Sequence, residues 1–368
     1  MPSFDLPPDH TPYTDAYFLR ARRILAADGL NPRVTYQVFI RKGPGIVSGI
    51  DEAVAILAMY ARIHGHDHGT HVYALPEGNE FQPGDSLMHI EAPIQQVVEL
   101  ETMYLGVISA AITRDNAHDL ELDAVRERGR AIRELCPDKQ LIYFGARHWH
   151  WSMDPEISRI LVDECGWDAC STDAGAHGAG LDKGVGTIPH ALVLAYAHAY
   201  GADRATVEAT LAFDRHMEPE AKRIALVDTF NREIDDSVAT ARAMSGRLFA
   251  VRLDTAGENV AQGSPAQGEL YWAGKGVTVE GTAAVRRALD EAGFEKVNIV
   301  LSSGFGKPDK LRAFVEGERK HGRLFEALGI GGVFDSWHAT SDIVRIEGRE
   351  LAKTGRGYLP NPAMRRVL

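Results

Sequence analysis

From about residue 116 the sequence alternates short apolar runs with stretches of helical spacing, and this alternation restricts the fold more than any other feature. Strands that alternate with helices form parallel sheets, and six or seven such units favour a complete or incomplete (β/α) barrel. An open doubly wound sheet is the alternative, but the sequence has no GxGxxG motif after a predicted strand to support it. The segment GFGK is not a GxxxxGK[ST] phosphate loop either, because Pro308 follows it in place of Ser or Thr. The apolar runs lie at 141–144, 167–170, 185–188, 224–228, 247–254, 297–303 and 331–335.

Residues 1 to about 115 mix helix and strand instead, which predicts an α+β domain. Near the C-terminus, residues 343–356 form a strand-like segment with a hairpin turn at Glu347–Gly348, and this segment could return to the first sheet. We therefore expect one α+β domain from 1–115 plus 341–368, and a barrel domain from 116–340. The expected elements of the first part are helices at 15–27, 51–64 and 94–112 and strands at 34–40, HVYALPEG and SLMHIEAP.

Charge and cysteine content narrow the function classes. Lys and Arg number 40 against 51 Asp and Glu, giving a net charge of −11, which argues against nucleic-acid binding. Three cysteines without a CxxC pair support neither a disulfide scaffold nor a Cys-rich zinc site, and favour a reducing cytoplasm. The longest apolar run, 53–61, is too short to span a membrane. We expect a cytoplasmic protein with small-molecule substrates.

Polar residues follow most of the predicted barrel strands. Because the carboxyl ends of barrel strands meet at one face, these residues should form one rim. Cations there suit anionic oxygens, carboxylates suit hydroxyls or a metal, and bare backbone N–H groups suit phosphate. Each residue alone has an ordinary explanation as a helix cap or a turn, but together they suit a phosphorylated sugar with a divalent metal. They are Arg147, His148, Asp173, Gly175, His190, Asp228, Arg252, Asp254, Ser302, Ser303 and Gly304.

Two histidine-rich segments have the HxH spacing of metal hydrolases, which makes a barrel metal hydrolase an alternative. HGHDHGTH (64–71) lies in a Gly-rich connection after a predicted helix, and we interpret it as a solvated loop. HWHW (148–151) carries interleaved tryptophans, which indicate packing under the barrel rim. We expect no protein metal ligand from either segment.

Eight segments in order resemble the nicotinate phosphoribosyltransferases, within the wider family that includes the nicotinamide and quinolinate enzymes. YTDAYFLRARRIL is similar to the TDxY motif, LPEGNEF and HIEAPIQQVVELETMYLG to the PEG and IEGP…ELET segments, and FGARHWH to FGxR. GVGTIPHAL is similar to GTMPHAL, and LVDTFN, VRLDT and SSGF to LVDT, VRLDSGD and SGG.

The resemblance implies a type II phosphoribosyltransferase-like fold and transfer of the 5-phosphoribosyl group from phosphoribosyl pyrophosphate to nicotinate, in NAD salvage. It implies Mg²⁺ on the pyrophosphate, ATP as co-substrate, and a homodimer or higher homo-oligomer with shared active sites. Quinolinate phosphoribosyltransferase, which decarboxylates without ATP, is one alternative. A non-catalytic relative that binds nucleotide is another.

The family's site residues carry over by position. Tyr17, supported by Asp15 and Thr14, would stack on the pyridine ring from a neighbouring subunit, opposite Phe144. Arg147 and Arg252 would contact anionic groups, Asp254 would hold ribose hydroxyls or metal, and Asp173 would lie near base and ribose. Ser303–Gly304 would bind the 5′-phosphate on its backbone. His190 matches the histidine that ATP phosphorylates, a role suited to an imidazole that is nucleophilic when neutral.

Three segments depart from the family pattern. Residues 334–340 stand where relatives carry a Gly-rich FGxGT segment, which questions the second phosphate loop and motivates the non-catalytic alternative. VRLDTAGE exchanges an Asp for Glu258, and the segment between Asp173 and His190 is Gly-rich and includes His177, which could alter the base pocket.

Overall fold

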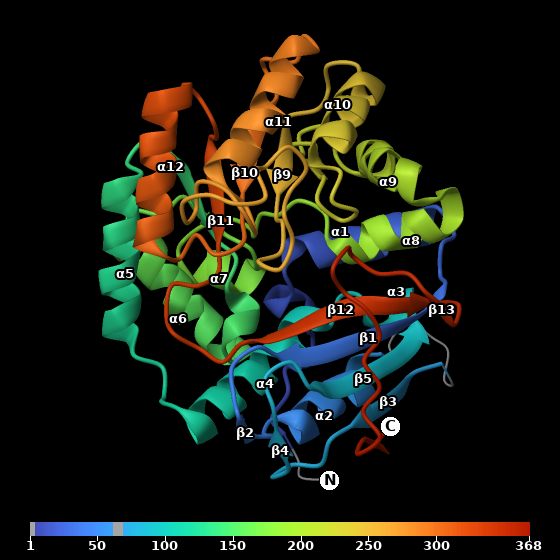
Figure 1. The fold of residues 1–368 in the computed structure, drawn as a ribbon. Coiled ribbons are helices and arrows are strands. Elements are labelled where there is room, and N and C mark those ends of the chain that lie inside the picture. The colour runs from blue at the N-terminus through green and yellow to red at the C-terminus, as the bar shows by residue number, and fades with distance from the viewer. Residues whose placement is uncertain (1–3, 62–68) are drawn as a thin grey trace.

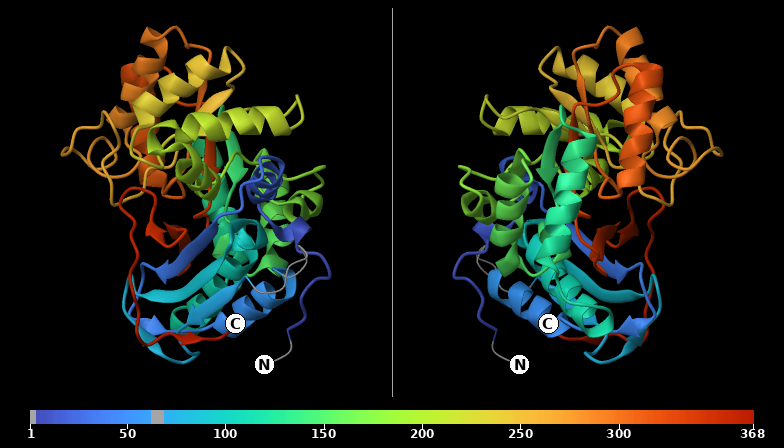
Figure 2. Two further views of the ribbon diagram at one scale, coloured as in Figure 1. Left: turned by 90° about the vertical axis from the view of Figure 1, so that its right-hand side faces the viewer. Right: turned by 90° about the vertical axis from the view of Figure 1, so that its left-hand side faces the viewer.

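The computed structural model describes residues 4–61 and 69–368, and its two largest sheets lie in different parts of the molecule. A parallel sheet surrounded by helices occupies one end, and an antiparallel sheet occupies the other (Figures 1 and 2). No helix among the described residues is long and apolar enough to cross a membrane.

The parallel sheet is an incomplete barrel, as the alternating pattern predicted. Its strand order is β7-β6-β11-β10-β9-β8, so β11 pairs back onto β6, while no ladder joins β7 to β8 among the described residues. The strands are β6 (Gln140–Tyr143), β7 (Ala169–Cys170), β8 (Ile224–Leu226), β9 (Ala250–Leu253), β10 (Asn298–Leu301) and β11 (Ala327–Ile330).

Helices cover the outer side of these strands (Figure 1). Apolar faces of the amphipathic helices and the buried strands form one core, which includes Leu141, Val251, Ile299 and Phe314. The helices are α5 (Leu122–Leu135), α6 (Asp154–Arg159), α7 (Asp173–Gly178), α8 (His190–Tyr200), α9 (Ala202–His216), α10 (Glu233–Met244), α11 (Val279–Glu291) and α12 (Pro308–His321). Short helical turns lie at Ala146–His148 (η2) and Trp151–Met153 (η3), and a π-helical turn at Ile160–Glu164 (η4) follows α6.

Two predicted barrel strands are wrong. Residues 185–188 form no strand; Val185 N–H donates to the carbonyl of Cys170, so this extended segment lies beside β7 in the gap of the barrel. The last strand is 327–330 rather than 331–335, and the latter residues form the loop that follows it. Gly329 weakened the strand pattern in the sequence. The structure shows why glycine stands there: a Cβ at this position would lie 2.5 Å from the Phe144 ring.

The antiparallel sheet joins the two ends of the chain. Its order is β13-β12-β1-β5-β3-β14, and β12 pairs with β1 from Val34↔Ile346 to Ile40↔Ala339, so the expected return of the C-terminal hairpin is confirmed. The strands are β1 (Arg33–Ile40), β3 (His71–Ala74), β5 (Ser86–Pro93), β12 (Ala339–Ile346), β13 (Arg349–Glu350) and β14 (Arg365–Arg366), with a separate pair β2 (Gly45–Ile46) and β4 (Glu80–Phe81).

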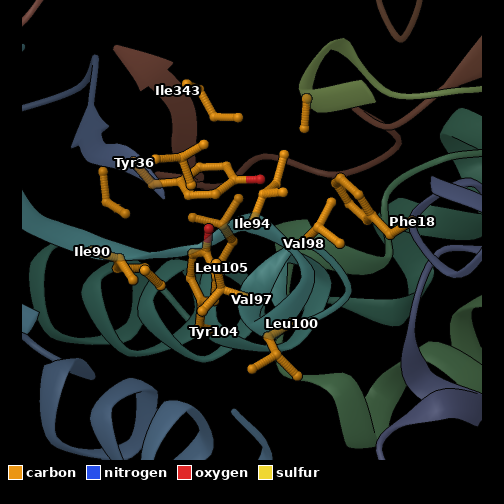
Figure 3. Close-up of a cluster of buried hydrophobic side chains, with 14 of the residues drawn as sticks. Phe18, Tyr36, Ile90, Ile94, Val97, Val98, Leu100, Tyr104, Leu105 and Ile343 are labelled. Carbon is orange, nitrogen blue, oxygen red and sulfur yellow. The ribbon is translucent and has the colours of Figure 1, made fainter. Parts of the chain in front are cut away.

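One face of this sheet is covered by helices. Tyr36 of β1, Ile90 of β5 and Ile343 of β12 pack toward the helical segment that carries Tyr104 and Leu105 (Figure 3). The predicted helix at 94–112 is divided into α3 (Ile94–Val97) and α4 (Glu101–Asn116). A short turn η1 (Thr11–Tyr13), α1 (Ala16–Ala27) and α2 (Ile50–Tyr60) complete this part, and α1 contacts α8 and α9 of the barrel.

Candidate active site

Seven of the eleven rim residues predicted from the strand ends line one cavity of about 690 Å³, whereas Asp173, Gly175, His190 and Asp228 do not. It lies at the carboxyl ends of β6, β9, β10 and β11, where parallel barrels form their sites. Its lining includes the aromatic rings of Tyr17, Phe144 and Phe334, five cationic side chains and the glycines of two loops. A smaller cavity of about 60 Å³ adjoins it and shares Tyr17, Arg147, Arg252 and Asp254. The main lining residues are Tyr17, Lys42, Arg128, Phe144, Arg147, His148, Arg252, Asp254, Ser302–Gly304, Gly306, Lys307, Gly329, Gly331, Gly332, Phe334–Ser336 and His338.

The loop after β10 exposes its backbone to the cavity. Ser303 and Gly304 both adopt positive φ, 72° and 78°, and the loop Ser303–Gly306, called the nest below, contributes Ser303, Gly304 and Gly306 to the cavity lining. The buried ammonium of Lys310 donates to the Ser303 carbonyl (2.7 Å) and fixes the loop; burial lowers the pKa of Lys310 to about 7. Helix α12 begins directly after Lys307, which adds its N-terminal dipole.

A second glycine-rich segment lies at the end of β11 and in the loop that follows it. Gly329, Gly331 and Gly332 line the cavity, together with Phe334–Ser336 and His338 of the segment that departs from the family pattern. The two loops pack backbone against backbone, because a Cβ on Gly306 would lie 1.8 Å from the Gly332 carbonyl oxygen. Arg128 Nη1 donates to the Gly306 carbonyl (2.8 Å) and also faces the cavity.

Tyr17 and Phe144 approach each other within one chain. Their ring centroids are 6.2 Å apart with a 66° interplanar angle, so one chain brings both rings to the cavity without a neighbouring subunit. This differs from the expectation that Tyr17 reaches across from a partner. A flat ring between two parallel rings needs about 7 Å, twice a carbon–carbon contact of about 3.5 Å. A bound base therefore requires one ring to turn and the gap to widen slightly.

A buried network positions Tyr17. Its hydroxyl donates to Asp15 Oδ2 (3.0 Å) and accepts from Arg147, and Thr102 donates to the same carboxylate (2.9 Å). Burial raises the pKa of Tyr17, which stays a neutral phenol. Burial alone would lower the pKa of Arg147, but the electrostatic effects of Tyr17, Asp15 and Glu101 are together larger and raise it above its ordinary value. Burial also raises the pKa of Glu101 to about 8, so this carboxyl is protonated at neutral pH.

Arg252 connects the aromatic pair to a carboxylate. Its guanidinium lies 6.0 Å from the Tyr17 centroid and 5.9 Å from the Phe144 centroid. Nη1 donates to Thr187 Oγ1 and Nη2 to Asp254 Oδ2, both at 2.8 Å. Burial alone would raise the pKa of Asp254, but Arg252 and then Lys353 hold it below its ordinary value.

His190 belongs to a charged triad that sequence reasoning only partly identified. His190 Nε2 lies 3.1 Å from Asp228 Oδ1 and 3.1 Å from Lys353 Nζ, and Lys353 Nζ lies 2.5 Å from Asp228 Oδ2. Lys353 also donates to the Asp254 carbonyl (3.0 Å). Despite full burial, Lys353 and then His190 lower the pKa of Asp228. His190 lines the smaller cavity, beside Arg252 and Asp254.

Several predicted residues lie outside the cavity. Asp173 lines neither cavity; its Oδ1 accepts from Gly184 N–H (2.8 Å), so it fixes the loop between β7 and α8. Thr14 supports the segment before α1 by donating to the carbonyls of His10 and Glu99. Glu258 accepts from Arg41 and Arg356, and His177 bonds the carbonyl of Asp182.

The described histidines of the segment 148–151 bond to different partners. His148 Nδ1 bonds the Gly331 carbonyl (3.0 Å), whereas His150 bonds Ser152 and Glu52. No group of three or more His, Cys, Asp or Glu side chains with metal-site geometry occurs within 4–61 and 69–368. His64, His66 and His68 lie outside the described residues.

Comparisons with known proteins agree with this architecture. Residues 15–112 match the family of the quinolinate phosphoribosyl transferase N-terminal domain. Nicotinate phosphoribosyltransferase of Bacillus subtilis (strain 168) is 21% identical over 339 residues, which cover 83% of this chain and 61% of that protein. The chain thus spans less than two thirds of that relative's length.

Solved structures show the same fold. Nicotinate phosphoribosyltransferase from Vibrio cholerae gives a TM-score of 0.67 at 13% identity, covering 93% of this chain and 88% of that one. The enzyme from Porphyromonas gingivalis gives 0.63 at 15% identity, covering 93% and 92%. The expected type II phosphoribosyltransferase-like fold and the resemblance drawn from the motifs are confirmed.

Proposed function

We propose that this chain, which has the fold of the nicotinate phosphoribosyltransferases, transfers a phosphoribosyl group from phosphoribosyl pyrophosphate to nicotinate. One observation carries the proposal: a single cavity is lined by an aromatic pair, by two arginines beside it, and by the glycine-containing loops that follow two adjacent strands. A sugar with a phosphate at C5 and a diphosphate at C1 needs two anion sites, and a pyridine carboxylate needs an aromatic slot with cations.

In the proposed reaction the C1–oxygen bond to pyrophosphate breaks and a bond from C1 to the ring nitrogen forms. The pyridine nitrogen is neutral, so no proton has to leave it. The protein's task is therefore to align the two reactants and stabilise separating charge. Tyr17 and Phe144 would hold the base, Arg147 and Arg252 its carboxylate or the phosphates, and Ser303–Gly306 the 5′-phosphate.

Mg²⁺ fits the donor set of this cavity. The ion prefers carboxylate and phosphate oxygens, and the described lining supplies Asp254 deep in the cavity and Asp335 at its rim. Asp254 would hold the ion or the ribose hydroxyls, because Asp335 is exposed and pairs with Lys42. When bound, Mg²⁺ would neutralise charge on the leaving pyrophosphate.

ATP assistance would act through His190. Nε2 faces Asp228 and Lys353, so Nδ1 is the nitrogen that would attack the γ-phosphorus of ATP, with ADP leaving. In the tautomer that donates its Nε2 proton to the Asp228 carboxylate, the Nδ1 lone pair would be free to attack. Hydrolysis of the resulting phosphohistidine would occur next to Arg252 and Asp254, which both cavities share.

The direct test supplies radiolabelled nicotinate, phosphoribosyl pyrophosphate, Mg²⁺ and ATP, and measures the mononucleotide. Absence of turnover with active-site-titrated protein would defeat the proposal. A thermal-shift series identifies the base, because the true substrate raises the melting temperature most when the sugar diphosphate is present. Nicotinate, nicotinamide and quinolinate are the three candidates.

Quinolinate phosphoribosyltransferase is the second candidate, favoured by the family match over residues 15–112. Quinolinate carries a second carboxylate, yet Arg147 and Arg252 already pair with Asp15 and Asp254. An ATP-independent reaction also has no use for the triad around His190. Release of labelled CO₂ from quinolinate without ATP would favour this candidate.

The structure also bears on the non-catalytic alternative and on the expected homodimer. The non-catalytic alternative rested on a missing glycine cradle, and Gly329, Gly331 and Gly332, which line the same cavity, argue against it. The homodimer stays a prediction, since Tyr17 and Phe144 meet within one chain. Light scattering at assay concentration measures the subunit number.

A further inference from the structure

The cavity wall contains a stacked pair of imidazoles. His148 follows β6 and His338 precedes β12; their ring centroids are 4.3 Å apart with an interplanar angle of 14°. Both rings line the cavity, next to the glycine loop after β11. His148 is anchored by Nδ1 on the Gly331 carbonyl (3.0 Å), and His338 Nδ1 lies 3.5 Å from Ser336 Oγ.

Cations surround this pair. Arg147 follows β6 directly before His148, and Arg41 and Lys42 follow β1 opposite His338. Asp335 is the carboxylate that faces His338, and it is paired with Lys42 at the exposed rim. Burial, then His338 and Arg147, hold the pKa of His148 well below its ordinary value. Burial against the cavity wall, then Arg41, Arg147 and Lys42, lowers the pKa of His338 to about 4, although the residue as a whole is exposed. Both shifts favour the neutral form of the pair in the free protein.

We propose that the His148–His338 pair binds a phosphoanion of the substrate and takes up one proton when it does so. The inference rests on the proposed function and specifies how one end of the sugar diphosphate is recognised. A polyanion placed against the wall favours the charged form of an imidazole, because an opposite charge within about 4–6 Å raises its pKa. Two stacked imidazolium ions would repel each other, so the pair holds one proton rather than two.

The placement suits one of the two anion sites. β11 lies between β6 and β10, so the pair and the nest of Ser303–Gly306 stand on adjacent parts of the same rim. The nest binds through backbone N–H groups, whose charge does not depend on pH. The histidine pair supplies a charge that appears only when the ligand arrives, which spares the free protein another cation beside Arg147.

Binding is measured by titration calorimetry with inorganic sulfate, whose charge is constant between about pH 5 and pH 8, the range in which histidine titrates. Measurement at pH 7 in two buffers of different ionisation enthalpy gives the number of protons taken up. We expect partial proton uptake at pH 7 that approaches one proton per anion toward pH 5, because the pKa of His338 is about 4 and a nearby opposite charge raises a pKa by about 1–3 units. The affinity should rise by up to about tenfold per unit fall in pH. Pyrophosphate and ribose 5-phosphate, titrated in parallel, show which end of the sugar diphosphate contacts the pair.

His338→Asn and His148→Asn should each abolish most of the proton uptake while anion binding persists on the glycine loops. His118→Asn is the matched control, since His118 lies 3.6 Å from Asp335 on the same rim but outside the stack. Uptake that survives in His338→Asn, a pH-independent affinity in the unmodified protein, or no anion binding at all would each overturn the proposal.

The measurement separates this proposal from the proposed function, because it needs no turnover. If anion binding takes up protons but nicotinate gives no product, the proposed function is wrong and the proposal for the histidine pair stands. If the protein turns over nicotinate and His338→Asn leaves the pH profile of KM unchanged, the proposed function stands and the proposal for the histidine pair is wrong.

Discussion

Lys353→Met tests whether the triad around His190 is built as the structure indicates. Lys353 is 6% exposed and sits between the Asp228 carboxylate and His190, so its removal leaves a fully buried carboxylate without its main countercharge. Breaking a buried pair in this way costs about 3–5 kcal/mol, and the remaining His190 contact favours the lower limit. At about 2 cal/mol/K of unfolding entropy per residue, a loss of about 3 kcal/mol lowers the melting temperature of this chain by about 4 °C.

The pH dependence gives a second readout. Because the pKa of Asp228 is lowered in the folded state, its stabilising contribution is present above the ordinary carboxyl pKa and lost as pH falls through the lowered value. Without Lys353 the folded-state pKa rises, so the variant should unfold at a higher pH during acid titration.

A double-mutant cycle with Asp228→Asn isolates the pair. The double variant leaves no buried charge at this position, and we expect a coupling free energy of at least about 2 kcal/mol from urea unfolding. Lys42→Met is the matched control: Lys42 also pairs with a carboxylate, Asp335, but at the exposed rim, so its loss should cost less than about 1 kcal/mol. A coupling energy under about 0.5 kcal/mol would refute the buried triad.

Four further variants follow from the site. His190→Ala should lose ATP stimulation and keep basal transfer, measured as initial rates with and without ATP; full retention of ATP coupling would contradict the assigned role. Arg252→Ala should lower kcat/KM by more than about 30-fold, equivalent to about 2 kcal/mol, because it removes a charge from a desolvated anion site. Gly306→Ala should weaken sugar-diphosphate binding and lower the melting temperature, since its Cβ would meet the Gly332 carbonyl; unchanged calorimetric affinity would show that the loops are not packed together. Glu101→Gln should stabilise the protein above about pH 5, because a folded-state pKa of about 8 makes stability fall as pH rises toward that value; parallel stability curves from pH 5 to pH 8 would contradict the buried protonated carboxyl.

Topology explains why so much of the cavity could be predicted from the sequence. Apolar runs with polar residues behind them place Arg147, Arg252, Asp254 and Ser303 at carboxyl strand ends, and a parallel barrel brings those ends together whatever the loops do. Placing these residues at one cavity therefore requires only the order of strands and helices along the chain, and not the side-chain contacts between them. The last strand was misplaced because Gly329 faces the Phe144 ring, and that steric requirement comes from another strand.

Lys353 and the histidine pair could not be found in this way. Lys353 lies in a basic C-terminal segment with no local pattern that distinguishes it from a surface lysine. It reaches His190, 163 positions away, only because β12 pairs with β1 and carries the following residues back over the barrel. His338 stacks on His148 for the same reason: the loop after β11 must cross the rim to enter β12.

The charges in the cavity show why these long-range contacts matter for binding. Arg147, Arg252 and Lys42 each contact a carboxylate of the chain, as they must if they are to stay charged and oriented without ligand. An incoming phosphate therefore competes with an existing partner at each of these cations and gains less than a bare charge would give. Groups without such a partner, namely the backbone N–H groups of two glycine loops and imidazoles that gain a proton on demand, can contribute their full interaction. Although the net charge of the chain is −11, the cavity lining carries five cationic side chains against the carboxylates Asp254 and Asp335, and the glycine loops and imidazoles add interactions that no carboxylate of the chain already uses.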